Sequence, residues 1–164
     1  MTSRNISFMK SLEGRWVGEG RGRFPPNIPE FRYVEELEIR QGGKPAVFEF
    51  RSATRNAETG GPMHVEVGFI RCPAGTSKIE MICSHPFGLS EISHGILRGD
   101  ILEFVCDEAS MLRTSTTGEV KTTQIRREYV LDHSAGSLVF TMDMATDRHP
   151  TIQNHLLCTL RKQT

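Results

Sequence analysis

One stretch near the N-terminus alternates glycine and aromatic residues with charged residues, and it limits most strongly how this chain can fold. It reads GRWVGEGRGRFP from residue 14 to residue 25. In a β-strand, alternate side chains lie on opposite faces, so one face carries Trp16, Phe24 and four glycines while the other carries the charges. Interior glycine weakens a strand and commonly marks a bend or the close approach of another group. Residues 14–25 therefore predict either a strand that coils at a barrel corner or one that makes room for a flat ligand beside Trp16.

Other alternating segments predict that most of the chain is β-structure. Apolar and charged residues alternate over 33–40 and 48–51, and the turn sequence QGGKP between them is typical of a hairpin. Further strands are expected at 63–70, 78–84, 89–97, 101–106, 124–132, 138–145 and 155–162, whereas 109–118 has no clear pattern. About ten short strands in succession predict an all-β fold, most simply a closed antiparallel β-barrel, with a two-sheet sandwich as the alternative.

A short helix is expected before the first strand. Ile6, Met9 and Leu12 recur at helical spacing, and Ser3 or Asn5 is a suitable N-terminal cap. The helix should end near residue 14, where it would cover one end of a barrel.

Length and composition favour one ordinary domain over residues 1–164. Lys plus Arg total 20, and Asp plus Glu also total 20, so the formal net charge is zero. The protein therefore has no overall positive electrostatic field that would attract nucleic acid or an anionic membrane. The first residues hold no long apolar run, which predicts no secretory signal, no membrane span and a cytoplasmic location. The four cysteines are widely spaced without a C-x-x-C pair, so we expect free, buried thiols.

Three motifs, in order along the chain, resemble those of the nitrobindin family of haem-binding β-barrels. The first is the stretch at 14–25, which fits the pattern G-x-W-x-G-x-G-x-G-x-[YF]-P. The second is PMHVEVGFIR at 62–71, and the third is MAT at 144–146 followed by QNHL at 153–156. Three motifs spread over nearly the whole chain are much more specific than one glycine pattern.

The resemblance implies a barrel that holds haem b, with His155 at the position of the family's axial histidine. It also places Met63 and His64 on the opposite side of the haem. The remaining cofactor-binding residues that it implies are Trp16, Gly18, Gly20, Phe24 and Met144. Here Gly18 and Gly20 would act as spacers for the flat ligand. No catalytic side chain beyond the haem iron is implied.

The function implied by the resemblance is that of a ferric haem protein that binds nitric oxide and isomerises peroxynitrite to nitrate, which would make the protein a haem-dependent peroxynitrite isomerase. The alternative is a non-catalytic carrier of a small apolar ligand such as a fatty acid. Arg127 shares a predicted strand face with apolar residues, so it could pair with a ligand's carboxylate or, equally, with a buried acid such as Glu35. A homodimer is one candidate oligomeric state.

Two departures from the family pattern bear on the site. The spacing from Met144 to His155 is one residue longer than in plant and animal nitrobindins, and the segment CSHPFG at 83–88 carries an insertion beside Pro86. Either change could shift His155 off the iron axis, in which case the barrel would persist without binding haem. His85 and His149 are the other imidazoles available near the pocket. No histidine pair has the close spacing typical of a protein-only zinc site.

Overall fold

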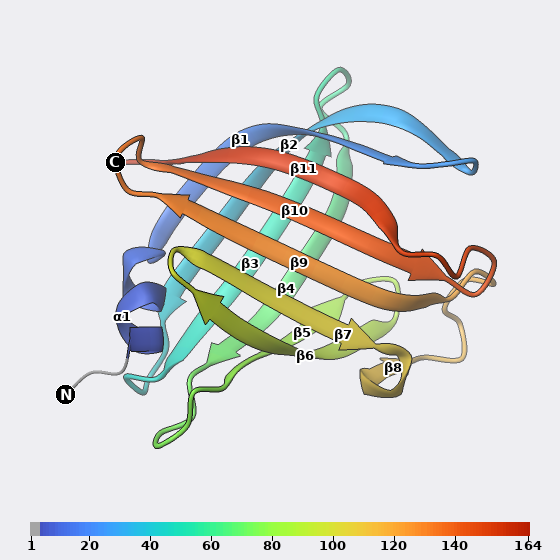
Figure 1. Cartoon of the computed structure of the whole chain (residues 1–164). Coiled ribbons are helices and arrows are strands. Elements are labelled where there is room, and N and C mark those ends of the chain that lie inside the picture. The colour runs from blue at the N-terminus through green and yellow to red at the C-terminus, as the bar shows by residue number, and fades with distance from the viewer. Residues whose placement is uncertain (1–3) are drawn as a thin grey trace.

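A computed structural model describes residues 4–164, and its strands follow the predicted segments closely (Figure 1). The elements are α1 (Arg4–Ser11), β1 (Gly14–Phe24), β2 (Ile28–Gln41), β3 (Val47–Asn56), β4 (Pro62–Arg71), β5 (Ile79–His85), β6 (Leu89–Arg98), β7 (Ile101–Asp107), β8 (Met111–Arg113), β9 (Thr122–Asp132), β10 (Ser137–Thr146) and β11 (Gln153–Lys162). A 3₁₀ turn (Glu108–Ser110) joins β7 to β8. This turn and β8 lie at the start of the segment 109–118, where the sequence has no clear pattern.

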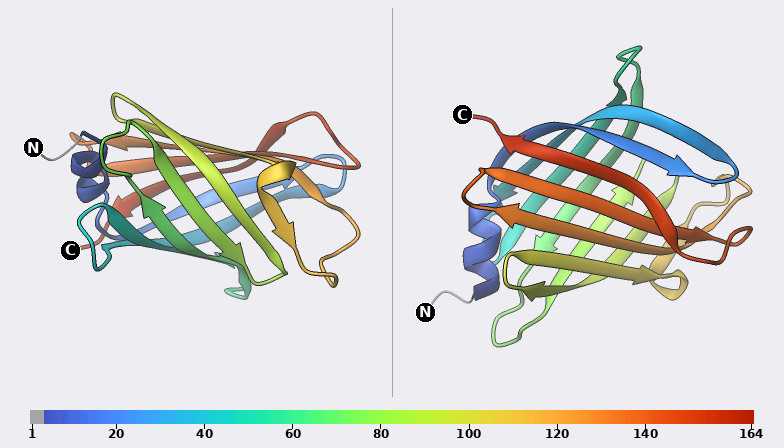
Figure 2. Two further views of the ribbon diagram at one scale, coloured as in Figure 1. Left: turned by 90° about the horizontal axis from the view of Figure 1, so that it is seen from below. Right: turned by 45° about the horizontal axis from the view of Figure 1, so that its top comes forward.

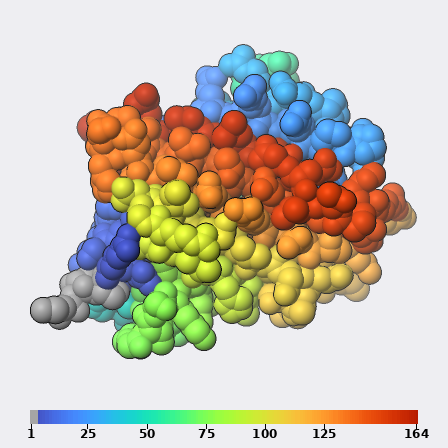
Figure 3. All heavy atoms as spheres, in the orientation of Figure 1, coloured from blue at the N-terminus to red at the C-terminus, as the bar shows by residue number. Residues whose placement is uncertain are grey.

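Ten antiparallel strands close into a barrel. Each strand from β1 to β6 pairs with the next, β7 pairs with β9, and β9, β10 and β11 continue the order. The pairing of β1 with β11 and that of β5 with β6 complete the ring, while the short β8 pairs with β6 as an extra strand. The predicted barrel is confirmed, and the alternative of a sandwich of two sheets is wrong. Figure 3 shows β7, β9, β10 and β11 side by side on one outer face.

Helix α1 lies against one end of the barrel (Figures 1 and 2). Its buried residues Phe8 and Met9 join the core, and Leu12 follows them. The helix ends at Ser11, slightly before the predicted boundary. Asn5 lies within the helix and donates to the carbonyl oxygen of Ser77 at 3.0 Å, so it is not the cap, and Ser3 lies outside the described residues.

Trp16 belongs to the end of the barrel that α1 covers. It is fully buried, and its Nε1 donates to the carbonyl oxygen of Leu12 at 2.9 Å, which ties the first strand to the end of the helix. The packed core fills this end, with Leu37, Phe48 and Leu138 among its buried members. The indole therefore serves as core packing beneath the helix.

The glycines of β1 allow close packing, and they do not leave open space for a ligand. A Cβ added to Gly18 would lie 1.9 Å from the carbonyl oxygen of Thr159 on β11, and one added to Gly20 would lie 2.5 Å from the ring of Tyr33. The expectation that these two glycines act as spacers for a flat ligand is wrong, because neighbouring protein atoms occupy that space. Glycine is required where another backbone approaches this closely.

All four cysteines are free and buried, as the sequence predicted. No helix in the described part of the chain is long and apolar enough to cross a membrane.

Candidate functional site

The main cavity lies in the half of the barrel away from α1. Its volume is about 450 Å³, which is within the range of small-molecule sites. Lining residues come from strand ends and turns far from Trp16, such as the start of β2, the start of β4 and the turn after β5. Most of the wall is apolar, with contributions from Phe31, Phe87, Ile125, Phe140, Met142 and Leu156.

His155 faces this cavity because β11 contains a β-bulge at that residue. Met142 pairs with Leu156, but the next pair joins Asp143 to Asn154, so His155 has no partner on β10. Successive side chains of a regular strand point to opposite faces, yet His155 and Leu156 both line the cavity. A bulge inserts one extra residue and redirects its side chain. The bulge therefore places the imidazole of His155 on the cavity wall.

Hydrogen bonding fixes the tautomer of His155. Its Nδ1 lies 2.8 Å from the carbonyl oxygen of Arg23, and because a carbonyl only accepts, Nδ1 carries the proton. The lone pair therefore resides on Nε2, which makes no hydrogen bond with the described residues. Burial lowers the pKa of His155 and so favours the neutral ring, and the rings of Phe24 and Phe31 approach it edge-on. A neutral imidazole with a free Nε2 is the form that binds a metal ion.

The structure brings together half of the predicted cofactor-binding residues. Those that line the main cavity are Met63, His64, Met144 and His155. The predicted residues that do not line it are Trp16, Gly18, Gly20 and Phe24. Phe24 does not line the cavity itself, but its ring packs against that of His155, with ring centroids 6.0 Å apart. The other imidazole near the bulge, His149, packs on Phe24 and does not line the cavity.

The wall opposite His155 contains a buried ion-pair cluster around Arg127. This side chain is fully buried, and its two terminal nitrogens reach different acids: Nη2 donates to Glu66 Oε1 at 3.1 Å, and Nη1 lies 2.6 Å from Glu91 Oε1. Burial alone would raise the pKa of Glu66, but Arg127 and the nearby imidazoles outweigh it and hold that pKa below its ordinary value. The partner expected from the sequence, Glu35, is not the acid that Arg127 pairs with.

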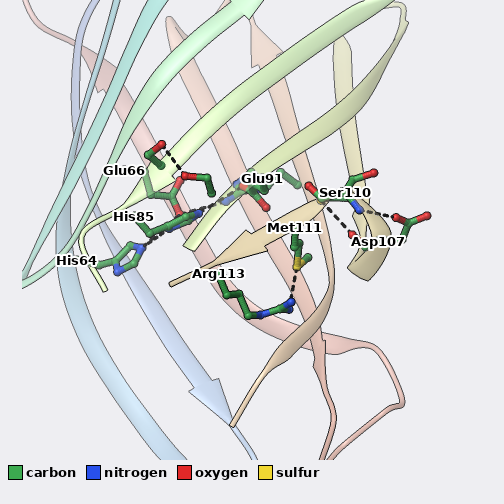
Figure 4. A network of polar contacts seen from close by, with 12 residues as sticks. His64, Glu66, His85, Glu91, Asp107, Ser110, Met111 and Arg113 are labelled. Atoms are coloured by element: carbon green, nitrogen blue, oxygen red, sulfur yellow. Dashed lines mark hydrogen bonds and ion pairs between the residues drawn. The ribbon is translucent and has the colours of Figure 1, made fainter. Parts of the chain in front are cut away.

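Two imidazoles extend this cluster into the cavity (Figure 4). His64 Nε2 and His85 Nδ1 lie 3.0 Å apart, and both nitrogens approach Glu66 Oε1, at 3.5 and 3.7 Å. The far nitrogen of His85, Nε2, lies 3.5 Å from Glu91 Oε1. The ring of Phe87 packs against both histidines. His85 thus lies deep in the wall, between the two carboxylates, while His64 stands nearer the opening.

A third acid, Glu35, lines the cavity apart from the ion pairs. Its Oε1 accepts a hydrogen bond from Ser52 Oγ at 2.8 Å, and its Oε2 is buried without a hydrogen-bond partner. Burial raises the pKa of Glu35 to about 7, because the neutral acid tolerates the low-polarity wall better than the carboxylate does.

The acids of the opposite wall were missed from sequence. Glu66 and Glu91 stand at the inward positions of β4 and β6, where apolar residues are the rule, and both are buried. An acid at an inward position in two strands, with Arg127 inward in a third, is a signal for a buried ion pair. The sequence contains this pattern, but the pattern does not show which strands are neighbours, so it cannot predict that these three side chains meet.

Comparison with known proteins agrees with this geometry. Residues 5–162 match a family described as the THAP4-like, heme-binding beta-barrel domain. Peroxynitrite isomerase 1 of Rhodococcus jostii (strain RHA1) is 36% identical over 157 residues, which cover 95% of this chain and 83% of that protein. Peroxynitrite isomerase Rv2717c of Arabidopsis thaliana is 34% identical over 158 residues, covering 96% and 88%.

Two further matches concern a longer relative and a solved structure. Peroxynitrite isomerase THAP4 of Rattus norvegicus is 37% identical over 154 residues, which cover 92% of this chain but 26% of that protein. The crystal structure of Rv2717c from M. tuberculosis superposes with a TM-score of 0.83 at 27% identity over the whole of both chains. The barrel, the cavity and these matches together show that this chain belongs to the family of THAP4-like haem-binding β-barrel domains, the nitrobindins.

Proposed function

We propose that this protein holds haem b in the main cavity, with His155 as the only protein ligand to the iron, and isomerises peroxynitrite to nitrate. The observation that carries the proposal is the bulge of β11, which places His155 on the wall of a largely apolar cavity of about 450 Å³. The relatives named peroxynitrite isomerase supply the reaction.

The residues present fit the cofactor. His155 offers a free Nε2 while its Nδ1–H donates to Arg23, and this backbone bond holds the ring orientation as the outer partners of metal-bound histidines do. Apolar and aromatic side chains around the cavity suit a flat macrocycle. Met63 and Met144 contribute flexible, polarizable surface, and Met63 lies at the opening with 43% of its surface exposed.

The chain's own part in the reaction is to position the reactants and exclude water. When bound, a ferric haem supplies a Lewis-acidic iron, the chemistry that breaks the O–O bond of peroxynitrite. The apolar walls would keep peroxynitrite inside the cavity and bulk water out of it. His64 is engaged with His85 and Glu66 on the opposite wall, which leaves the space facing His155 free for a small ligand.

The alternative of a fatty-acid carrier loses its main support in this structure. Arg127 was the candidate partner for a ligand carboxylate, but Glu66 and Glu91 hold its two terminal nitrogens. A second carboxylate would have to displace one of two buried acids to reach the guanidinium.

Rapid-mixing kinetics test the proposed function. The chain loaded with haemin should accelerate the decay of peroxynitrite and raise the yield of nitrate, while the haem-free chain should leave both unchanged. Free haemin at the same concentration is the control for chemistry outside the cavity. Haem loading without any acceleration would retain the haem-protein assignment and refute the isomerase.

Three further features belong to the same proposal. Nitric oxide, as a small neutral ligand, would enter the same cavity, and a shift of the Soret band on its addition tests this.

A cytoplasmic, single-domain protein accords with four free buried thiols and one barrel. A homodimer is supported by the cross-strand row of exposed Phe69, Ile82 and Ile92 on β4, β5 and β6, and light scattering at micromolar concentration should then give twice the chain mass.

A further inference from the structure

Three side chains on the wall opposite His155 bring their potential metal ligands to one point. His64 and Glu66 occupy alternate positions of β4, and so point to the same inner face. Val67 pairs with Ser84, which makes Glu66 and His85 the next residues along β4 and β5. All three side chains line the main cavity. They come from neighbouring strands and not from one mobile loop, so the cluster is built into the barrel (Figure 4).

The spacing of the three atoms matches that of ligands around a single metal ion. His64 Nε2, His85 Nδ1 and Glu66 Oε1 are separated by 3.0, 3.5 and 3.7 Å. Ligand bonds of ~2.1 Å at angles between octahedral and tetrahedral place neighbouring ligand atoms ~3.0 to ~3.4 Å apart. The observed triangle needs adjustments of only a few tenths of an ångström. Three ligands on one side of an ion leave its other positions open, here toward the cavity.

The surroundings also support a cation. His85 is 7% exposed, and its Nε2, which has no hydrogen-bond partner, faces Glu91 Oε1 at 3.5 Å. A ligating histidine commonly directs its other N–H at a carboxylate in this way. The two acids Glu66 and Glu91 face one guanidinium, that of Arg127, so the paired groups leave one negative charge in the wall. A bound cation would offset that charge.

A second set of possible ligands shares His85. Cys83, His85 and Glu91 also have their donor atoms within 4.8 Å of one another, and all three residues are buried. Glu91 is already in close contact with Arg127 at 2.6 Å, and the pKa of Cys83 is raised by burial, which opposes formation of the thiolate ligand. The set that includes His64 reaches the cavity, so an ion can enter it.

We propose that His64, Glu66 and His85 form a binding site for a divalent transition-metal ion such as Zn²⁺ or Co²⁺, on the cavity wall opposite His155. The two-histidine, one-carboxylate set favours such an ion over Mg²⁺ or Ca²⁺, which prefer oxygen ligands alone. The site does not depend on the proposed haem chemistry, because none of its ligands is His155.

Titration of the untagged, haem-free full chain with Co²⁺ tests the site. One equivalent should bind, with visible bands typical of nitrogen and oxygen ligands, and Zn²⁺ should displace it. His64→Ala removes one ligand at the partly exposed edge of the cluster and should weaken binding by about tenfold or more. The matched control is His94→Ala, which removes an exposed histidine from the outer face of β6 and should leave binding unchanged.

Other results would overturn the proposal. One is the absence of stoichiometric Co²⁺ binding by a chain whose circular dichroism shows the folded barrel. Another is binding of equal strength in His64→Ala with an intense sulfur-to-metal band, which would assign the ion to Cys83. A third is equal weakening by His94→Ala, which would indicate surface histidines as the ligands.

Discussion

The two walls of the cavity each present imidazole, but they hold it by different means. On β11, His155 stands among aromatic rings, and its Nδ1 bonds to a backbone carbonyl. On β4 and β5, His64 and His85 belong to a cluster of side-chain charges centred on Arg127. One imidazole is positioned by the backbone, and the other two by contacts with each other and with buried carboxylates.

This difference separates the two proposed sites, one on each wall of the cavity, by what holds their side chains. A backbone carbonyl keeps the same charge at every pH, so it fixes the tautomer of His155 and leaves Nε2 free. The cluster around Arg127 depends on the charges of Glu66 and Glu91, and removing one of them disturbs the others. Variants that disturb the charge cluster around Arg127 and spare His155, or the reverse, test whether the two walls are independent.

The largest expected effect comes from removing the buried guanidinium. Arg127→Leu should lower the free energy of unfolding by about 3–5 kcal/mol, because Glu66 and Glu91 would remain buried without a cation. Urea denaturation measures the change. Arg126→Leu is the matched control: the Arg126 side chain is about half exposed and its partner Glu103 keeps a second cation, Arg98, at 3.8 Å, so a loss of less than about 1 kcal/mol is expected. Equal losses in the two variants would contradict a special role for the buried cluster.

The next effect concerns pH and Glu35, whose pKa is raised by burial from 4.5 to about 7. Between these values the folded chain keeps a proton that the unfolded chain has released, so stability falls as pH rises through this window. The contribution lost is roughly 3 kcal/mol. Glu35→Gln should flatten the stability profile between pH 4.5 and 7, measured by urea denaturation. Glu36→Gln, on the outer face of β2, should retain the slope, and a slope unchanged in Glu35→Gln would refute this assignment.

Sequence reasoning predicted the barrel and its strands because period-two alternation reports directly which side of a strand is buried. The motif at 153–156 predicted His155, although regular alternation from Cys158 and Leu156 would place that residue on the outside. The bulge decides its direction, and it depends on pairing with β10 that a single strand's pattern does not contain. For the same reason Gly18 and Gly20 were misjudged, since the atoms that fill their space come from β11 and β2.

A smaller effect is expected where β1 and β11 approach each other. Gly18→Ala would place its Cβ against the Thr159 carbonyl, which belongs to a backbone that cannot easily move, and should cost about 1–3 kcal/mol of unfolding free energy. Gly43→Ala adds the same atom in open space and serves as the control. Thermal unfolding followed by circular dichroism compares the two. A fully stable Gly18→Ala variant would show that the strands can separate locally.

The smallest effect should come from loosening the bulge without touching the histidine. The Nδ2 of Asn154 donates to Asp143 Oδ1 at 2.9 Å and to the carbonyl oxygen of Leu156 at 3.2 Å. These two hydrogen bonds span the β-bulge at His155. Asn154→Ala should weaken haemin binding by about fivefold, equivalent to ~1 kcal/mol, through a less ordered His155. Thr159→Ala, an exposed change on the same strand, should leave affinity unchanged. Identical affinities in the two variants would show that the bulge needs no such bond.

Haemin titration of His155→Ala tests the division between the walls most directly. The Soret band reports iron coordination, and circular dichroism verifies that the barrel persists. We expect His155→Ala to lose haemin binding or to weaken it severely, because the imidazole nitrogen that β11 offers to the cavity is removed. His64→Ala should still take up one haemin with an unaltered ferric spectrum. An unchanged Soret band in His155→Ala, or its loss in His64→Ala alone, would contradict the assignment of the iron to the bulge of β11.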